Sequence, residues 1–317
     1  MKPLIEVKNL HVTIHPYQAV RGVSFTLYEG EKLGIVGESG CGKTILMKTL
    51  LRLLPSNATI DSGEIIYQSQ DLCQLCEKQL QKIRGKEIGM IFQDPMTALN
   101  PTMKIGAQIA EGYLQHFPSA TSHSAKMRAL ELLIQVGVPD PELRLEQYPH
   151  LLSGGLRQRA LIALALAAEP QVLIADEPTT ALDVTIQAQI LHLLRDLQQN
   201  KSTLLITHDL SLIASFCDRV LVMYAGQIVE EALVEDLFAH PQHPYTERLL
   251  QSIPRIDQKL EKLIPIPGTP PDLSTPPSGC SFCPRCPKAF DICHSTTPPL
   301  FSSKTHSARC WLKEEKS

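Results

Sequence analysis

The sequence predicts a protein built mainly on a layered α/β fold, and three observations support this prediction. Short apolar runs of strand length alternate with longer helical patterns through the first 230 residues. One of these runs leads into a glycine-rich loop that opens a predicted helix. The chain has 317 residues, 43% hydrophobic and 20% charged, which suffices for one large domain with an appendage or for two modest domains.

The expected strands are short apolar runs that read as buried strands of a sheet. They cover residues 33–36, 88–92, 172–175, 203–206 and 220–223. A helix is expected over residues 45–54, directly after the first strand. A second helix is expected between residues 185 and 199, because its apolar side chains recur on one side, at Ile186, Ile190, Leu193, Leu194 and Leu197.

Two segments depart from the alternating pattern. Residues 95–148 lack buried-strand runs and are expected to be a helical insertion in the α/β core. Residues 265–277 hold six prolines in 13 positions, too many for a helix or a central strand, so this stretch is expected to be an extended connector. The expected segments are therefore a first core part, a helical subdomain, a second core part and a small Pro/Cys-rich C-terminal extension, with the bounds 1–94, 95–152, 153–255 and 256–317.

Composition excludes some classes of function. A net charge of −3 and an aromatic content of 5% give no basic footprint or base-stacking surface, so we expect no nucleic-acid partner. No run approaches the roughly 18 apolar residues that span a bilayer, and the amino terminus lacks the apolar core of a signal peptide. The expected location is cytosolic, with any membrane role peripheral.

A phosphate-binding loop is the strongest chemical signal. Residues 37–44 match G-x-x-x-x-G-K-[ST] between a predicted strand and a predicted helix, which is the context that such a loop requires. Backbone N–H groups of the loop and the helix start would cradle phosphate oxygens, the lysine would meet the terminal phosphates, and the threonine hydroxyl would bind Mg²⁺. The candidate ATP-binding residues are Gly37, Glu38, Ser39, Gly40, Cys41, Gly42, Lys43 and Thr44.

Polar residues at other strand ends complete a candidate hydrolytic site. Asp176 closes the strand 172–175, where its carboxylate can hold Mg²⁺, and Glu177 is placed to orient or deprotonate the attacking water. His208 and Gln93 follow two further strands. Taken alone, a histidine or glutamine at a strand end is more often structural.

Leu152-Ser153-Gly154-Gly155-Leu156-Arg157-Gln158 resembles the signature sequence of the ABC ATPase family. The phosphate loop, Gln93, Asp176-Glu177, the turn that ends in Asp183, and His208 accompany it in the family's order. The resemblance implies a RecA-like P-loop NTPase core with an ABC β-subdomain. It also implies that Ser153, Gly154 and Gly155 close over ATP held by a second ATPase subunit, that Gln93 ligates Mg²⁺ and senses the γ-phosphate, and that His208 reaches that phosphate.

Adenine recognition departs from the family pattern. Family members place an aromatic residue near the end of the first strand, where this sequence has Ile14. Tyr17, three residues later, is the candidate that could stack on adenine instead.

Two further stretches resemble the peptide-importer branch of the family. They are residues 92–101 and the segment His240-Pro241-Gln242-His243-Pro244-Tyr245-Thr246. The resemblance implies an ATPase that powers uptake of di- or oligopeptides, or a small solute such as nickel. Its partners would be a second, different ATPase, two membrane permease subunits and, indirectly, an extracytoplasmic solute-binding protein, at the cytoplasmic face of the cell membrane. The alternative is a soluble ABC ATPase that serves no transporter.

Five of the nine cysteines lie within the last 38 residues, a clustering that favours metal over disulfides in a reducing compartment. The segment resembles the C-terminal extension of D-type peptide-permease ATPases, in which four cysteines hold a [4Fe–4S] cluster. The residues matched by that resemblance are Cys280, Cys286, Cys293 and Cys310, with Cys283 as an extra thiol. Zinc, or no metal at all, stays an alternative, and Cys73 and Cys76 are expected to be structural.

Overall fold

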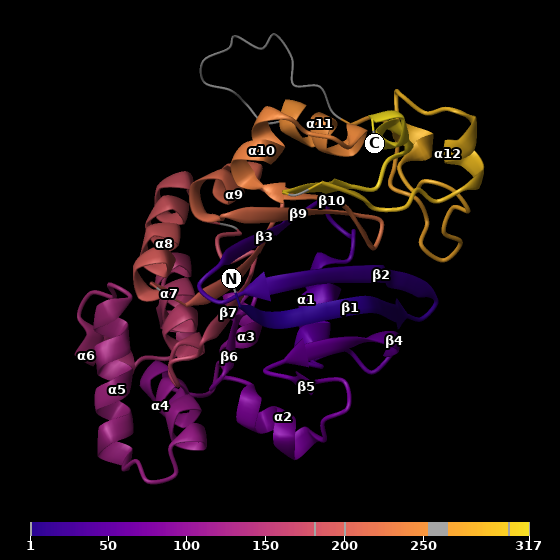
Figure 1. Ribbon diagram of the computed structural model, residues 1–317. Coiled ribbons are helices and arrows are strands. Elements are labelled where there is room, and N and C mark those ends of the chain that lie inside the picture. Colours follow the sequence, from indigo (N-terminus) through magenta and orange to yellow (C-terminus); the bar gives the residue numbers. More distant parts are fainter. Residues whose placement is uncertain (1, 181, 200, 253–265, 304, 317) are drawn as a thin grey trace. The chain divides into compact units, whose positions relative to one another are not determined.

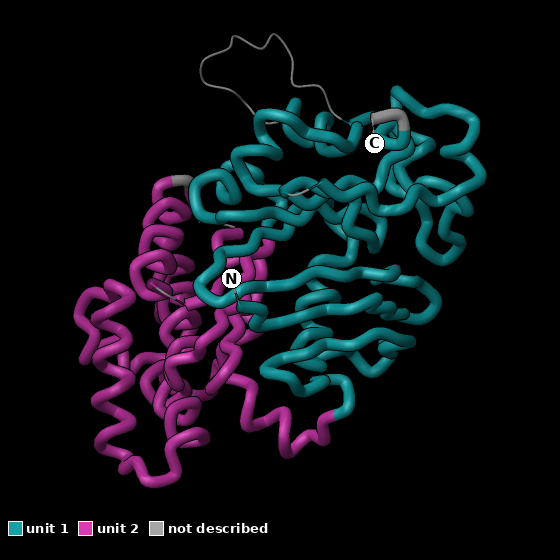
Figure 2. The backbone as a smooth tube through the Cα atoms, in the orientation of Figure 1, with its two compact units in different colours: residues 1–74, 207–317 teal, residues 75–206 magenta. Residues whose placement is uncertain are grey.

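The structure is a computed structural model that describes residues 2–180, 182–199, 201–252, 266–303 and 305–316 (Figure 1). The chain forms two compact units (Figure 2). Unit 1 comprises residues 1–74 and 207–317, and unit 2 comprises residues 75–206. The four segments expected from the sequence divide the chain differently from these two units, and that division stays a prediction.

An antiparallel sheet forms the first half of unit 1. Its strands run in the order β2 (Tyr17–Tyr28), β1 (Pro3–Ile14), β4 (Ala58–Tyr67) and β5 (Gln70–Asp71). Buried side chains in β1 change from odd positions, such as Val7, to even ones, such as Leu10. The pairing register of β1 shifts between these two residues, and a bulge of this kind moves the following side chains to the other face.

A second sheet of unit 1 carries the phosphate loop. Its strands run in the order β11 (Phe301–Ser302), β12 (His306–Ala308), β10 (Gln227–Leu233), β9 (Arg219–Tyr224) and β3 (Lys32–Val36). Strands β3 and β9 pair in parallel and are almost wholly buried, as the apolar runs predict. The helices of unit 1 are α1 (Lys43–Leu50), α9 (Leu210–Phe216), α10 (Val234–Ala239), α11 (Pro244–Gln251) and α12 (Asp291–Ser295).

One helix end differs from the prediction. The helix expected to reach residue 54 ends at Leu50. Arg52 has a φ of +51°, in the left-handed region, and Pro55 follows it three residues later. Both features are incompatible with continuing the helix, although apolar residues continue through this stretch.

Unit 2 combines three buried parallel strands with helices. The strands run in the order β8 (Ser202–Thr207), β7 (Val172–Asp176) and β6 (Ile88–Ile91). Helix α2 (Glu77–Ile83) precedes β6, and the helices α7 (Gly154–Ala165) and α8 (Val184–Leu197) flank β7 in the sequence. Residues 95–148 form only helices and turns, as expected, in α3 (Pro95–Ala98), α4 (Ile105–His116), α5 (Ser122–Gln135) and α6 (Pro141–Leu145).

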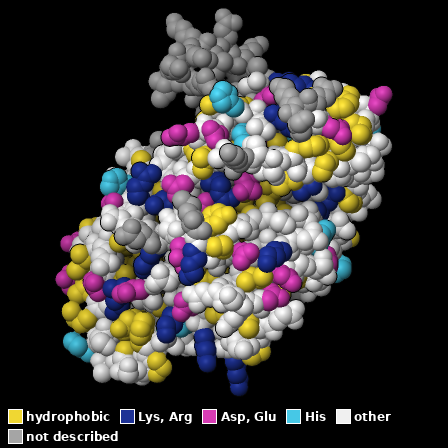
Figure 3. All heavy atoms as spheres, viewed as in Figure 1, with side chains coloured by type: hydrophobic (Ala, Val, Ile, Leu, Met, Phe, Trp, Pro, Cys, Tyr) yellow, Lys and Arg dark blue, Asp and Glu magenta, His cyan; other side chains and the backbone are white. Residues whose placement is uncertain are grey.

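Within the described ranges, no helix is both long and apolar enough to cross a membrane. Positive and negative side chains are interspersed over the face of the molecule in Figure 3.

Candidate functional site

The phosphate loop, residues 37–44, connects β3 to α1 in unit 1 and has a backbone that demands glycine at two positions. Gly42 has a φ of +103°, and a Cβ atom there would lie 2.3 Å from the carbonyl oxygen of Ala19. A Cβ at Gly37 would lie 2.1 Å from the carbonyl oxygen of Met223. Any larger residue would therefore push the loop away from β2 or β9, so the two glycines fix the path of the loop.

Lys43 lies within this loop and is only 5% exposed. Its ammonium group donates hydrogen bonds to the carbonyl oxygens of Gly37, at 2.7 Å, and Glu38, at 3.0 Å. The lysine is thus held by the loop that it would serve, as a buried positive charge suited to phosphate oxygens. Burial raises the pKa of the neighbouring Cys41 thiol, which therefore stays neutral.

Glu177 follows β7 in unit 2 and is held by two side chains. Its carboxylate oxygen Oε2 accepts hydrogen bonds from Gln93 Nε2, at 3.2 Å, and from Thr180 Oγ1, at 2.9 Å. Its φ of +47° is unusual for a glutamate, and its N–H group donates to Ile206 of β8 at 3.0 Å. Local backbone strain of this kind is frequent at functional sites. The structure therefore brings together Gln93 and Glu177 from the candidate site.

The other predicted catalytic side chains occupy strand ends. Asp176 is the last residue of β7 and is 2% exposed. His208 directly follows β8 and is exposed. The adenine candidate, Tyr17, begins β2 and is 49% exposed, while Ile14 ends β1. Stacking of Tyr17 on adenine stays a prediction.

The glycine pair at the start of α7 is not required by packing within this chain. Ser153 is the N-cap, and its Oγ accepts a hydrogen bond from the N–H of Leu156 at 3.4 Å. A Cβ atom at Gly154 would meet nothing within 4 Å, and one at Gly155 would meet only Ile186, at 3.7 Å. The absent side chains leave the positive end of a 12-residue helix open to a ligand from outside the chain.

Asp183 has a structural role that the sequence did not indicate. It is the N-cap of α8, where its carboxylate accepts a hydrogen bond from the N–H of Ile186 at 2.9 Å. A contact of Asp183 with nucleotide stays a prediction. Ala181, in the same predicted turn, lies outside the described residues.

All five C-terminal cysteines line one small apolar cavity in unit 1. Phe282, Trp311 and His243 are also among its lining residues. Burial raises the pKa of the Cys280 thiol to about 12, and the thiols of Cys286 and Cys310 shift in the same direction because of burial and their sulfur neighbours. Thiolates gathered in an apolar site need a compensating cation, so the donor set fits a soft metal centre.

The sulfurs surround this cavity without converging on a single point. In the part of the chain that the structure describes, no three histidine, cysteine or acidic side chains lie close enough to hold one metal ion as they stand. Cys283, the extra thiol, lies 3.5 Å from His294 Nδ1. Cys283 thus lines the cavity together with the four predicted ligands.

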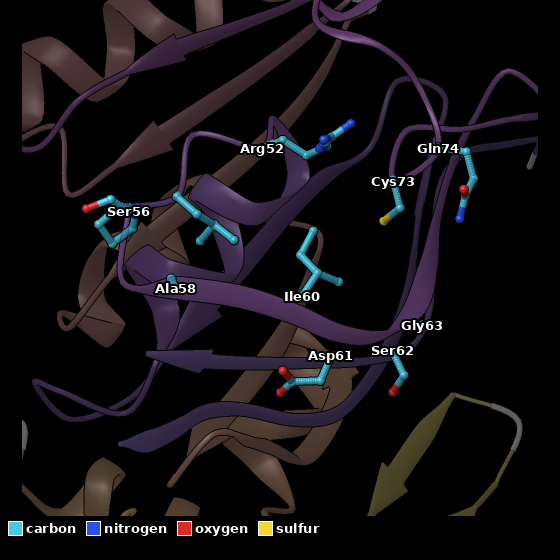
Figure 4. A pocket seen from close by; sticks show the side chains of 11 residues that line it. Arg52, Ser56, Ala58, Ile60, Asp61, Ser62, Gly63, Cys73 and Gln74 are labelled. Atoms are coloured by element: carbon cyan, nitrogen blue, oxygen red, sulfur yellow. The ribbon is translucent and has the colours of Figure 1, made fainter. Parts of the chain in front are cut away.

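A further hollow in unit 1 is a different feature. It measures about 520 Å³ and lies beside β4, with Arg52, Ile60 and Cys73 around it (Figure 4). None of its lining residues belongs to the phosphate loop or to the cysteine cavity.

Comparison with known families decides the identity of the chain. The family model "ABC transporter" matches residues 20–180, which include the phosphate loop and the start of α7. A dipeptide transport ATP-binding protein, DppD, of Lactococcus lactis subsp. cremoris is 53% identical over 321 residues, spanning 99% of this chain and 92% of that protein. The chain belongs to the ATP-binding subunits of ABC transporters.

A second match places this ABC subunit in one branch of the family. The model "Oligopeptide/dipeptide transporter, C-terminal region" matches residues 229–293. The oligopeptide transport ATP-binding protein OppD of Bacillus subtilis is 52% identical, over 98% of this chain and 88% of that protein. The match covers the His-Pro-Tyr segment and four of the five clustered cysteines, and Cys310 lies beyond it.

Solved structures confirm the ABC cassette fold. The ATP-binding cassette MJ0796, in a dimeric post-hydrolysis state with ADP and Pi, superposes with a TM-score of 0.66 at 27% sequence identity. The superposition covers 73% of this chain and 99% of that cassette. A CbiO1 structure from Clostridium perfringens gives a TM-score of 0.65 at 26% identity, over 76% of this chain and 92% of that one.

Three contacts of this ABC subunit were not foreseen from its sequence. Thr180 holds Glu177, as described above. The hydroxyl of Tyr245, in the His-Pro-Tyr segment, accepts a hydrogen bond from the N–H of Glu38 at 2.9 Å. Arg285 forms an ion pair with the carboxylate of Glu38. The position of Thr180, three residues after Glu177, is the only sequence signal that could have indicated any of them.

Proposed function

We propose that this chain hydrolyses ATP to power a peptide importer, as one of two ATPase subunits that sandwich two ATP molecules between them. The observation that carries the proposal is the open start of α7, where two glycines stand although the packing of this chain leaves room for a Cβ atom at each. The relatives named as dipeptide and oligopeptide transport proteins support the solute class.

The residues of each unit have distinct roles in this proposal. The phosphate loop and Lys43 bind the β- and γ-phosphates, while Thr44, Asp176 and Gln93 hold Mg²⁺ directly or through its water shell. Glu177, oriented by Gln93 and Thr180, positions the attacking water and takes up its proton. His208 stabilises charge on the γ-phosphate.

Ser153, Gly154 and Gly155 bind the γ-phosphate of the ATP held by the partner ATPase. We expect a different, related chain as that partner. Two permease subunits would receive the force through residues 95–152, at the cytoplasmic face of the membrane, and a solute-binding protein would act through those permeases.

Gly154→Asp tests the sandwich. A Cβ atom at this position would meet nothing within 4 Å, and an acidic residue suits a helix start, so we expect the fold to be retained. Its carboxylate would occupy the position of the partner's γ-phosphate. We expect ATP binding to persist while ATP-driven pairing of the two ATPases and hydrolysis are lost. Gly154→Ala is the matched control and should pair normally. Normal pairing and hydrolysis by the aspartate variant would contradict the proposal.

Transport is tested with the complete complex in liposomes. We expect the rate of phosphate release to rise with a binding protein loaded with di- or oligopeptides. Stimulation by a nickel-loaded binding protein instead would replace peptide with metal as the solute. ATPase activity without any response to membrane partners would favour the soluble alternative.

For the cysteine cavity, we propose that Cys280, Cys286, Cys293 and Cys310 hold a [4Fe–4S] cluster. The soft donor set and the apolar lining support it. A cluster would supply folding free energy to an extension that is too small and proline-rich to bury a core of its own. Oxygen-free purification should give protein with iron and sulfide in equal amounts. Stoichiometric zinc, or no metal, would overturn the assignment, and Cys283→Ser should keep its iron whereas Cys286→Ser should lose it.

A further inference from the structure

Arg285 connects the cysteine-rich extension to the phosphate loop within unit 1. It ends a short 3₁₀ turn, Cys283–Arg285, and its side chain is 4% exposed. Its two terminal nitrogens donate to the two carboxylate oxygens of Glu38, with Nη1–Oε2 at 2.6 Å and Nη2–Oε1 at 2.9 Å. This bidentate pairing is the strongest geometry available to an arginine and a carboxylate.

The remaining contacts of Arg285 leave the guanidinium only one orientation. Nε donates to the carbonyl oxygen of Pro267 at 2.9 Å, and Nη1 also donates to the hydroxyl of Tyr224 at 3.2 Å. The guanidinium lies 5.8 Å from the centroid of the Tyr224 ring. An arginine side chain is always charged in a protein, so the guanidinium faces the Glu38 carboxylate as a cation. A guanidinium held in this way fixes the position of the Glu38 carboxylate.

Glu38 in turn contributes three groups to the shape of the loop. Its carboxylate is held by Arg285, and its N–H group is held by the hydroxyl of Tyr245. Its carbonyl oxygen accepts hydrogen bonds from Lys43 Nζ, at 3.0 Å, and from the N–H of Cys41, at 3.3 Å. The position of Glu38 therefore determines where the lysine that meets ATP is held.

The negative charge of Glu38 affects the binding of ATP. A carboxylate beside a phosphate-binding loop repels a triphosphate unless a cation neutralises it. We propose that Arg285 is a positioning residue for ATP binding: it neutralises and orients Glu38 from the C-terminal extension, and thereby sets the phosphate loop for the nucleotide. The proposal rests on the ATPase function of the chain and adds to it a residue that lies outside the ATPase core.

The test compares Arg285→Gln, Glu38→Gln and the double variant, in the full-length protein. Arg285→Gln should raise the Kd for a fluorescent ATP analogue, and the KM for ATP, about tenfold, with little change in kcat. The Kd of the double variant should return to within about threefold of the wild-type value, because the uncompensated negative charge of Glu38 is gone. Arg285→Lys keeps the positive charge but loses the bidentate pairing, so its Kd for ATP should fall between those of the wild type and Arg285→Gln.

Arg309→Gln is the matched control. Arg309 is also a partly buried arginine of the extension, but it donates to the carbonyl oxygens of Ile228 and Pro298. Its substitution should leave the Kd for ATP within about twofold. The fluorescence of Trp311, the only tryptophan, shows whether the extension is folded in each variant.

The inference would be overturned by an equal loss of ATP affinity in Arg285→Gln and Arg309→Gln, or by the absence of rescue when Glu38→Gln is added. Unchanged affinity in Arg285→Gln would overturn it as well. A wild-type protein that binds no ATP would instead refute the ATPase function.

Discussion

Replacement of Phe282 by alanine should detach the C-terminal extension from the rest of unit 1. Phe282 is 1% exposed, and its ring lies 5.3 Å from that of Tyr224, in an edge-on arrangement, and 5.4 Å from that of Tyr245. The other buried apolar residues in the described part of the extension are smaller: three cysteines, Ala308 and Pro298. Phe282 is therefore the principal apolar anchor of the extension.

The magnitude follows from this packing. Removing a buried phenylalanine side chain costs about 3–5 kcal/mol, and loss of the edge-on aromatic contact is part of that cost. The side chain belongs to the extension, so the cost falls on the docking of residues 266–316 and not on the whole cassette. With a urea dependence of about 1–3 kcal/mol per M, the midpoint of the extension should fall by at least about 1 M.

Trp311 makes the assay specific, because it is the only tryptophan and lies in the extension, where its indole N–H donates to Thr296. Its fluorescence reports the extension, while far-UV circular dichroism reports the whole chain. In Phe282→Ala the fluorescence midpoint should move below the dichroism midpoint, at equal metal content. The control is Phe290→Ala, 43% exposed in the same segment, which should shift either midpoint by less than about 0.5 M. Coincident midpoints, or equal effects of the two substitutions, would refute the reasoning.

Three further outcomes are expected. Glu177→Gln should lower the rate of phosphate release at least about 100-fold with ATP affinity retained, and undiminished hydrolysis would remove Glu177 from its role as base. Asp183→Ala removes the N-cap of α8 and should lower the free energy of unfolding by about 1 kcal/mol, as measured in urea, with Asp183→Asn close to the wild type. Burial lowers the pKa of His243 to about 4, below the ordinary 6.5 of the unfolded chain. The unfolded chain therefore binds a proton that the folded chain excludes, and the free energy of unfolding should fall by about 2 kcal/mol as pH is lowered to about 5. His243→Asn, which keeps a capping acceptor, should flatten that profile relative to the wild type.

The sequence could predict the five buried parallel strands because their physical cause is local. Buried parallel strands are short runs of apolar residues, and all five expected runs became strands. The end of α1 could not be predicted in the same way. Residues 51–54 remain compatible with a helix in composition, and the helix ends at the left-handed backbone of Arg52, before Pro55.

The candidate site shows the same division between local and distant causes. The glycines of the phosphate loop and the N-cap at Ser153 can be predicted from the sequence, because the backbone requirement at each position depends only on residues close by in the chain. The pairing of Arg285 with Glu38 spans 247 residues, and nothing near either residue indicates the other. The hydrogen bond from Glu38 to Tyr245 spans 207 residues, so the His-Pro-Tyr segment could be read only as a turn before a helix.

A buried carboxylate explains why the His-Pro-Tyr segment and the extension act as one support for the phosphate loop. Glu230 of β10 is fully buried and accepts hydrogen bonds from the N–H groups of Gln242, at 2.6 Å, and His243, at 2.9 Å. Its Oε1 also lies 2.6 Å from Nε2 of His306, in β12. An unpaired carboxylate at this depth would be costly, so each segment stabilises the position of the other through Glu230. Because Tyr245 follows His243 by two residues, the hydroxyl that reaches Glu38 depends on this anchor. Loss of Glu230 should therefore disturb the contact of Tyr245 with the phosphate loop.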